Sequence, residues 1–252
     1  MGDKPVIIRT FDAGSDKMLK EQEMLHEKNP LLGWRAIRYC FARPKIFRTQ
    51  LRALLRSSSF GNVHILIPMI CSINEVIKVK AMLEEEKKSL LNEGIPFNKN
   101  IPLGIMVEVP SVAVAADLFA PYVDFMSIGT NDLVQYVMAV DRENGKVSSL
   151  GNYFEPSILR LIKHTIDSTE FNKNESYFIS MCGEMASNKE AMFLLLGMGL
   201  RHFSMPSWKI CEMKTFACNV DIKQAEEAYK RISSMKRPDE ILSCIKEYIK
   251  NC

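Results

Sequence analysis

The alternation of short, β-rich apolar runs with helical patterns restricts the fold of this chain more than any other feature of its sequence. Six runs have the length and composition of buried strands, namely residues 6–9, 64–69, 103–107, 125–128, 178–181 and 202–205. Between most of them, apolar residues recur with the period of a helix, as in the segment that Pro44 opens and that carries Phe47, Leu51 and Leu54. Strands that alternate with helices in this way predict a parallel sheet, and therefore an α/β fold.

Three sequence signals mark the beginnings of helices. Ser72 with Glu75, and Ser187 with Glu190, have the spacing of a capping box. Pro238 is expected to begin the last helix, because proline is favoured in the first turn.

The absence of a nucleotide-binding motif bears on how the sheet is arranged. No GxGxxG sequence is present, which favours closure into a (β/α)8 TIM barrel over an open, doubly wound sheet. Two further strands, near Trp34 and near Asn219, would bring the number to eight. A chain of 252 residues is long enough for one such barrel, so a single domain over residues 1–252 is expected.

Composition limits the class of protein. The formal net charge is only +3, which gives no reason to expect a nucleic acid or a membrane surface as a partner. Seven cysteines without a CxxC pair indicate reduced thiols and no cysteine zinc site. The first residues are charged and have no apolar signal core, so a cytoplasmic protein is expected.

Residues 124–142, with the sequence DFMSIGTNDLVQYVMAVDR, combine a predicted strand with several polar groups. The apolar run ends at Gly129, Asn131 and Asp132 follow, and Arg142 ends the stretch. Parallel α/β barrels present their catalytic groups at the carboxyl ends of their strands. The alternative is an ordinary strand-to-helix connection in which the Asn and Asp residues cap the helix.

Other predicted strands also end in polar residues. Arg9 ends the first run, Glu108 follows the third, and Cys182 follows the fifth, with Glu184 close behind. In a barrel all of these residues lie at the same rim. This coincidence favours a functional site over a set of unrelated structural residues.

Glu108 and Asp132 follow neighbouring strands and are candidates for a shared magnesium site. Mg2+ usually takes only one or two protein carboxylates and completes its coordination with water and substrate oxygens. The alternative for Glu108 is a buried ion pair with an arginine. Two carboxylates together with several arginines fit an anion that needs both a metal and guanidinium groups, as phosphoryl transfer does.

Six segments resemble the phosphoenolpyruvate-binding domain of enzyme I of the bacterial sugar phosphotransferase system, and they occur in that family's order. They are residues 9–17 (RTFDAGSDK), 29–38 (NPLLGWRAIR), 104–110 (GIMVEVP), 127–133 (SIGTNDL), 139–142 (AVDR) and 181–184 (MCGE). The resemblance runs from about residue 6 to the C-terminus. Pyruvate phosphate dikinase and phosphoenolpyruvate synthase share the domain, but AVDR and the compact length look more like enzyme I.

The resemblance implies a (β/α)8 barrel that binds phosphoenolpyruvate and Mg2+ at its C-terminal rim and forms a homodimer. It also implies a role for each matched residue. Glu108 and Asp132 would be the metal ligands, and Arg9, Arg35 and Arg142 the arginines that hold the phosphoryl group, with Arg56 in the same or a supporting role. Asn131 would contact the substrate, and Cys182 would be the acid that protonates the enolate at C3 when pyruvate forms.

Elementary chemistry agrees with these roles but leaves alternatives for three of the residues. Arg35 could be a surface arginine of a helix. Arg56 ends an amphipathic helix, where a cation also interacts favourably with the helix dipole. A cysteine such as Cys182 is mostly protonated at neutral pH and can donate a proton, but taken alone it could be an inert buried thiol.

The resemblance also implies a missing partner. In enzyme I, the phosphoryl group passes to a histidine on a preceding domain, which also docks the phosphocarrier protein. None of the four histidines here, at positions 26, 64, 164 and 202, has a context like that histidine. The chain is therefore expected to act with a histidine domain supplied on the same or a separate chain, in the first step of sugar uptake. The alternatives are a non-catalytic binding and dimerisation module, and a barrel aldolase or lyase acting on pyruvate-like acids.

Overall fold

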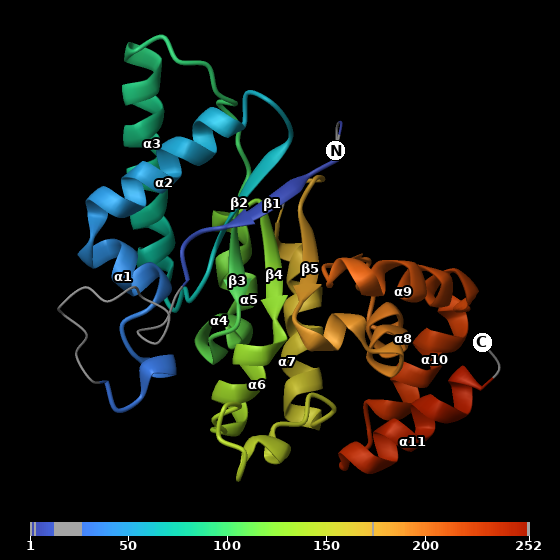
Figure 1. Ribbon diagram of the computed structural model, residues 1–252. Helices are drawn as coiled ribbons and strands as arrows, with labels where there is room; N and C mark the ends of the chain where they lie inside the picture. The colour runs from blue at the N-terminus through green and yellow to red at the C-terminus, as the bar shows by residue number, and fades with distance from the viewer. Residues whose placement is uncertain (1, 3, 13–26, 173, 251–252) are drawn as a thin grey trace. The chain divides into compact units, whose positions relative to one another are not determined.

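A computed structural model describes residues 2, 4–12, 27–172 and 174–250 of the chain (Figure 1). The chain divides into two compact units, Met1–Met106 with Tyr122–Phe125, and Val107–Pro121 with Met126–Cys252. Strands β3 and β4 begin in the first unit and end in the second. Each unit is described by itself.

The first unit is built on parallel strands. β1 (Val6–Arg9), β2 (Val63–Ile67) and β3 (Leu103–Val107) are neighbours in that order, as expected for strands joined by helices. All five residues of β2 and of β3 are buried, which is typical of parallel strands covered on both faces. In the register, Arg9 is level with Leu66, so Arg9 lies at the carboxyl end of β1.

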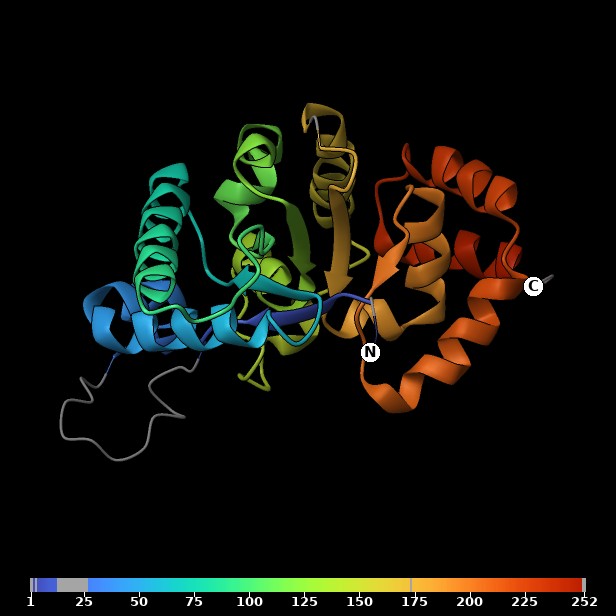
Figure 2. The same cartoon turned by 90° about the horizontal axis from the view of Figure 1, so that it is seen from above.

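Three helices accompany these strands: α1 (Ala36–Ala42), α2 (Pro44–Ser57) and α3 (Ile73–Asn92). α2 packs along α3, as Figures 1 and 2 both show. The capping box that was expected before α3 is confirmed, because the Ser72 side chain accepts from the Glu75 backbone N–H and the Glu75 side chain accepts from the Ser72 N–H.

The second unit continues the alternation. β4 (Phe125–Gly129), β5 (Phe178–Cys182) and β6 (His202–Phe203) are neighbours in that order, and β5 and β6 are parallel. Four helices of this unit lie between β3 and β5 in the sequence: α4 (Pro110–Val114), α5 (Ala116–Phe119), α6 (Thr130–Met138) and α7 (Pro156–Asp167). α7 packs against α4, α5 and α6.

The C-terminal helices of this unit are α8 (Lys189–Gly197), α9 (Ser207–Asn219), α10 (Ile222–Ile232) and α11 (Pro238–Ile249). α8, α10 and α11 pack against one another (Figure 2). A Cβ atom on Gly197 would lie 2.1 Å from the carbonyl oxygen of Ala225, so this close approach of α8 and α10 requires glycine. Short 3-10 helices occupy Pro30–Leu32, Ala120–Tyr122, Ser148–Leu150, Ser168–Phe171 and Glu184–Ser187.

All six strands that the apolar runs predict are present, but the two additional strands are not. Trp34 lies in the connection before α1, and Asn219 is the last residue of α9, so both strand predictions are wrong. The Trp34 ring packs edge-on against Tyr39 of α1 with ring centroids 5.0 Å apart, so a local helix covers its apolar surface. The described residues therefore form an α/β chain with six strands where eight were expected.

The expected start of α8 is also corrected. Ser187 is not its cap, because Ser187 ends the 3-10 helix before it. Asn188 caps α8 instead, and its side chain accepts a hydrogen bond from the Ala191 N–H at 2.8 Å. The spacing of Ser187 and Glu190 therefore predicted a helix in the right place but the wrong capping residue.

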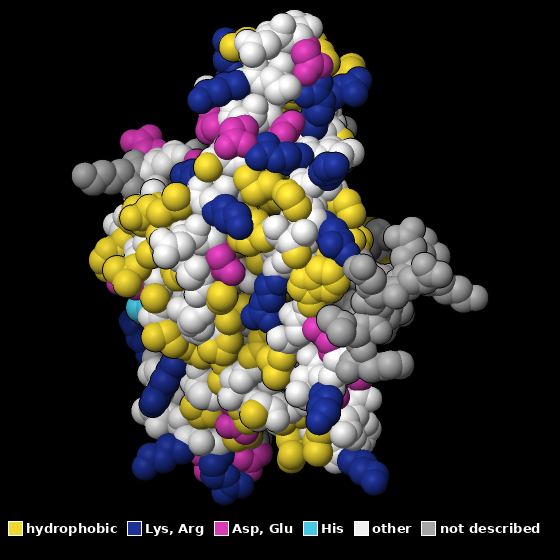
Figure 3. Space-filling view, turned by 90° about the vertical axis from the view of Figure 1, so that its left-hand side faces the viewer, with side chains coloured by type: hydrophobic (Ala, Val, Ile, Leu, Met, Phe, Trp, Pro, Cys, Tyr) yellow, Lys and Arg dark blue, Asp and Glu magenta, His cyan; other side chains and the backbone are white. Residues whose placement is uncertain are grey.

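The surface shows no strong single-sign charge on the face that Figure 3 presents. Lysine and arginine side chains lie scattered among hydrophobic and acidic ones there, which agrees with a net charge of +3. Across the described residues, each helix is too short or too polar to cross a bilayer.

Candidate active site

In the first unit, two of the predicted phosphate-binding arginines share one buried carboxylate. Nη1 of Arg9 lies 3.0 Å from Oδ2 of Asp12. Arg35 donates from Nε to Oδ1 of Asp12 at 3.0 Å and from Nη2 to Oδ2 at 2.9 Å, which is a bidentate contact. The side chains of Asp12 and Arg35 are 1% and 7% exposed, whereas that of Arg9 is 46% exposed. Asp12 therefore brings Arg9 and Arg35 together, although the sequence did not single it out.

The backbone around Arg35 is fixed by its neighbours. Arg38 donates from Nη1 to the carbonyl oxygens of Leu32 and Gly33 at 2.6 and 3.0 Å, which ties α1 to the turn before it. Ala36, directly after Arg35, is fully buried and has φ +50°. A left-handed conformation costs a residue other than glycine about 1–2 kcal/mol, so the packing around α1 holds this strained residue in place. Residues 13–17 of the first motif lie outside the described residues.

Arg56 stands apart from these two arginines. It is exposed in the last turn of α2, and the chain then turns into the amino end of β2 at Val63. Arg9, in contrast, lies at the carboxyl end of the parallel strand β1. The structure does not bring Arg56 to that end, and its position is that of a cation at a helix C-terminus.

In the second unit, two acidic residues follow strand ends and are almost completely buried. Glu108 comes directly after β3 and is 2% exposed, and Asp132 is 6% exposed. α6 begins directly after β4, so Asp132 lies in the first turn of α6, where the helix dipole favours a negative charge. Neither Asn131 nor Asp132 occupies the capping position, because Gly129 is the N-cap of α6 and both residues lie in the first turn of the helix.

Arg142 lies beside one of these acids. Its Nη1 atom is 3.4 Å from Oδ1 of Asp132, and its side chain remains 40% exposed. The chain leaves α6 at Ala139, which has φ +54°, and the Gln135 side chain accepts from the backbone N–H of Arg142 at 3.2 Å. The turn after α6 thus returns Arg142 to the acid at the start of the same helix.

Cys182 is the last residue of β5, and its thiol contacts the neighbouring strand β4. Ser127 donates from Oγ to the Cys182 sulfur at 3.5 Å, and the thiol donates to the carbonyl oxygen of Ile128 at 3.5 Å. Thr130 donates from Oγ1 to the Cys182 carbonyl oxygen at 3.2 Å. The Cys182 thiol thus lies against two polar groups of β4.

The turn after β5 packs on the start of α6. The Asn131 side-chain oxygen accepts from the Glu184 backbone N–H at 3.1 Å. Gly183 has φ +96°, and a Cβ atom there would lie 2.6 Å from Oγ1 of Thr130, so this turn requires glycine. Ser127, Thr130 and Gly183 were not singled out in the sequence, although all three belong to the SIGTNDL and MCGE motifs.

Glu108 and Asp132 are chemically suited to a magnesium ion. Both supply hard carboxylate oxygens, and Mg2+ is commonly held by one or two protein carboxylates. No group of three or more His, Cys, Asp or Glu side chains that could hold a metal ion occurs in the described part of the chain. As donors, the two carboxylates alone would suit Mg2+.

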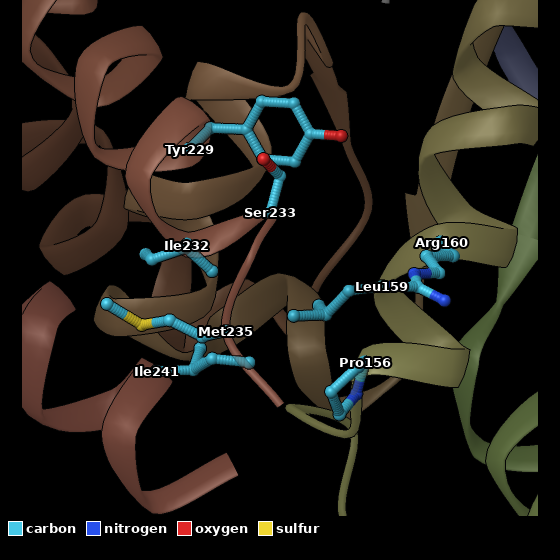
Figure 4. A pocket seen from close by; sticks show the side chains of 8 residues that line it. All are labelled: Pro156, Leu159, Arg160, Tyr229, Ile232, Ser233, Met235 and Ile241. Carbon is cyan, nitrogen blue, oxygen red and sulfur yellow. The ribbon is translucent and has the colours of Figure 1, made fainter. Parts of the chain in front are cut away.

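The second unit has two other features, a turn segment and a groove. Residues 144–153 contain turns and the 3-10 helix Ser148–Leu150, and Asn144 accepts from the backbone N–H groups of Lys146 and Ser148. A groove between α7 and the α10–α11 connection is lined mainly by apolar side chains, with Arg160, Tyr229 and Ser233 among them (Figure 4). None of the predicted site residues lines this groove.

Comparison with known proteins identifies the family of these residues. Residues 1–222 match the model of the phosphoenolpyruvate-binding domain of phosphoenolpyruvate-utilising enzymes. The chain is 45% identical over 251 residues to the phosphoenolpyruvate-protein phosphotransferase of Staphylococcus carnosus, with 100% of the chain and 43% of that protein covered. It is 46% identical over 250 residues to the Bacillus subtilis protein of the same name, with 99% of the chain and 43% of that protein covered. The chain thus spans less than half of these relatives.

A solved structure shares the fold at low sequence identity. A citrate lyase from Burkholderia xenovorans superposes with a TM-score of 0.50 and 14% identity, covering 81% of this chain and 67% of the lyase. At this identity the likeness concerns the fold alone.

Proposed function

Since the chain belongs to the phosphoenolpyruvate-binding domain family and is homologous to the C-terminal part of enzyme I, we propose that it binds phosphoenolpyruvate with Mg2+ and supports phosphoryl transfer to a histidine on another domain, releasing pyruvate. The observation that carries this proposal is that one arginine, two carboxylates and a thiol lie at or close after strand ends, namely Arg9, Glu108, Asp132 and Cys182. Phosphoryl transfer needs positive groups on the phosphate oxygens and a proton for the enolate, and this residue set supplies both.

Arginine supplies the phosphate contacts. Arg9, Arg35 and Arg142 carry permanent charges on planar forks that match phosphate oxygens better than lysine does. Arg9 and Arg142 keep 46% and 40% of their side chains exposed, so a ligand can reach them. Asn131 contacts the substrate through its side chain. Arg56 is left out of this proposal because it lies toward the other end of the strands.

Glu108 and Asp132 would hold Mg2+, which supplies positive charge to the phosphate and carboxylate oxygens of the substrate when it is bound. Arg142, 3.4 Å from Asp132, then binds next to the carboxylate that holds the metal. The two acids need no further protein ligand for this role.

Cys182 provides the proton in the reaction. The bond between the phosphorus and the enol oxygen of phosphoenolpyruvate breaks, and the phosphoryl group goes to the acceptor histidine. The pyruvate enolate left behind takes a proton at C3 from the Cys182 sulfur, which Ser127 and the Ile128 carbonyl hold in place. The thiolate that remains regains a proton before the next turnover.

The proposal includes a complete barrel. In the described residues, β1 and β6 each have one strand neighbour, and a (β/α)8 barrel needs two strands beyond the six present. We propose that the domain is nevertheless a barrel of this type, and that it forms a homodimer in the cytoplasm. The phosphohistidine domain and, through it, the phosphocarrier protein would be its further partners.

A chimaeric protein tests the proposal most directly. This chain replaces the matched region of the Bacillus subtilis phosphotransferase, and the chimaera is mixed with phosphoenolpyruvate carrying a labelled phosphate and with Mg2+. Label on a histidine of the Bacillus part is expected. A chimaera that folds, as judged by circular dichroism, but takes up no label while the Bacillus protein does would overturn the catalytic proposal.

Binding measurements, together with the labelling experiment, distinguish this proposal from the non-catalytic alternative. A binding module would bind phosphoenolpyruvate in calorimetry but give no labelled histidine in the chimaera. Cys182→Ala in the chimaera is expected to leave binding unchanged and to slow pyruvate formation. The aldolase or lyase alternative predicts turnover of a pyruvate-like acid without phosphate, and the two arginines gathered on Asp12 argue against it.

A further inference from the structure

We infer that Asp12 is a positioning residue for phosphate recognition: it orients the guanidinium groups of Arg9 and Arg35 toward a phosphoryl group. This inference rests on the proposed function and adds to it a residue to which neither the sequence motifs nor the family comparison gave a role. It follows from the geometry of three side chains in the first unit.

Both oxygens of the Asp12 carboxylate contact the two arginines. Oδ2 faces both Nη2 of Arg35, at 2.9 Å, and Nη1 of Arg9, at 3.0 Å, while Oδ1 accepts from Nε of Arg35 at 3.0 Å. Two parallel N–H···O bonds fix the plane of the Arg35 guanidinium, which a single contact would leave free to rotate. Sharing Oδ2 sets the distance between the two cationic groups.

Burial makes Asp12 a fixed part of the structure and not a group that a ligand displaces. Its side chain is 1% exposed and that of Arg35 is 7% exposed, whereas that of Arg9 is 46% exposed. An approaching anion therefore meets Arg9 first, with Asp12 behind it. The three side chains together carry one net positive charge, so the cluster still attracts a phosphate.

Replacing Asp12 by asparagine distinguishes a positioning role from a simple charge effect, because the two predict opposite changes in the affinity for phosphoenolpyruvate. Loss of a negative charge alone would strengthen the attraction of the arginines for an anion. Loss of the bidentate contact removes the two bonds that hold the plane of the Arg35 guanidinium, and this would weaken binding. We expect Asp12→Asn to raise the dissociation constant of phosphoenolpyruvate about tenfold or more, as for other lost charge-assisted bidentate contacts.

The experiment is calorimetric titration of the 252-residue chain and its variants with phosphoenolpyruvate in the presence of Mg2+. Asp12→Glu keeps the charge and is expected to recover part of the affinity. The Arg35→Lys variant has already lost the planar guanidinium that Asp12 holds. Asp12→Asn is therefore expected to change the affinity much less in this variant than in the unaltered chain. Thermal unfolding of each variant shows whether it is folded at the temperature of the titration.

The outcomes distinguish this inference from the proposed function. Equal or tighter binding by a folded Asp12→Asn variant would overturn the role of Asp12 and leave the proposed function standing. Lower thermal stability with unchanged affinity would likewise make Asp12 a structural residue only. Absence of Mg2+-dependent binding by the unaltered chain would overturn the proposed function and this inference with it.

Discussion

Among single residues, Arg142 has the most direct expected effect on substrate binding, because it combines an exposed guanidinium with a contact to the predicted metal ligand Asp132. Arg142→Ala is expected to weaken phosphoenolpyruvate binding by about 1.5–3 kcal/mol, the usual contribution of a hydrogen bond to a charged group. This corresponds to a rise in the dissociation constant of about 10- to 150-fold, measurable by calorimetry with Mg2+.

Arg142→Lys is the matched control. It retains the charge but loses the planar fork, so its affinity is expected to fall between those of the unaltered chain and Arg142→Ala. Equal affinity of the alanine variant and the unaltered chain would remove Arg142 from the phosphate site.

For single residues, the sequence was sufficient to predict those that lie next to a strand end. It did not indicate residues whose role depends on a contact with a residue far away in the sequence. Arg9, Glu108, Asp132 and Cys182 follow apolar runs, and the rule that parallel strands carry functional groups at their carboxyl ends was sufficient to select them. Asp12 meets Arg35 across 23 residues of sequence, and no local pattern indicates that contact.

At the scale of secondary-structure elements, the cap of α8 gives a prediction that separates two adjacent residues. Asn188 accepts from the Ala191 N–H, whereas the Ser187 hydroxyl donates to the carbonyl oxygen of Glu184 in the preceding 3-10 helix. Asn188→Ala is expected to lower the free energy of unfolding by about 1 kcal/mol.

Ser187→Ala is expected to change that free energy by no more than about 0.5 kcal/mol, as for most substitutions near the surface. Urea unfolding of the two variants makes the comparison. A larger loss in Ser187→Ala than in Asn188→Ala would return the cap to the position that the sequence pattern indicated.

Helices and strands could be predicted where the local sequence determines them. They could not be predicted where their formation depends on a partner that is distant in the sequence. Six strands coincide with short apolar runs bounded by turns, and α2 begins at its proline, as expected. The runs near Trp34 and Asn219 failed because a strand needs a neighbouring strand, and α1 and α9 form in those regions instead.

For the molecule as a whole, a buried thiol predicts a loss of stability in alkali. Burial, with the negative charge of Asp12 as a lesser cause, raises the pKa of Cys40 from 9.0 to about 11. The unfolded chain therefore loses this proton at a lower pH than the folded chain does. The contribution of Cys40 to the free energy of unfolding is fully present below pH 9. It is lost as the pH rises toward 11, at about 1.4 kcal/mol per pH unit.

Urea unfolding between pH 8 and 11 tests this expectation. Cys40→Ala lacks the thiol, so its free energy of unfolding should fall less steeply over this range than that of the unaltered chain. Cys211→Ala, which removes an exposed cysteine of α9, is the matched control and should keep the original slope. Parallel curves for Cys40→Ala and the unaltered chain would contradict the prediction.

Barrel closure can be tested through α9, whose apolar side chains are poorly covered in this chain. Met213 is the one buried residue within Ser207–Asn219, and Trp208 and Ile210 are 77% and 49% exposed. In a closed barrel, the helices form a ring that packs on the outside of the strands. A closed barrel with α9 in this ring would therefore cover part of its apolar surface and reduce the exposure of Trp208.

The chain has two tryptophans, so Trp34→Phe leaves Trp208 as the sole tryptophan emitter. In the 252-residue chain, acrylamide should quench its fluorescence efficiently. In the Bacillus chimaera carrying the same substitution, quenching should fall severalfold and the emission should shift to the blue. Identical quenching in the two proteins would contradict closure of a barrel with α9 in its outer ring.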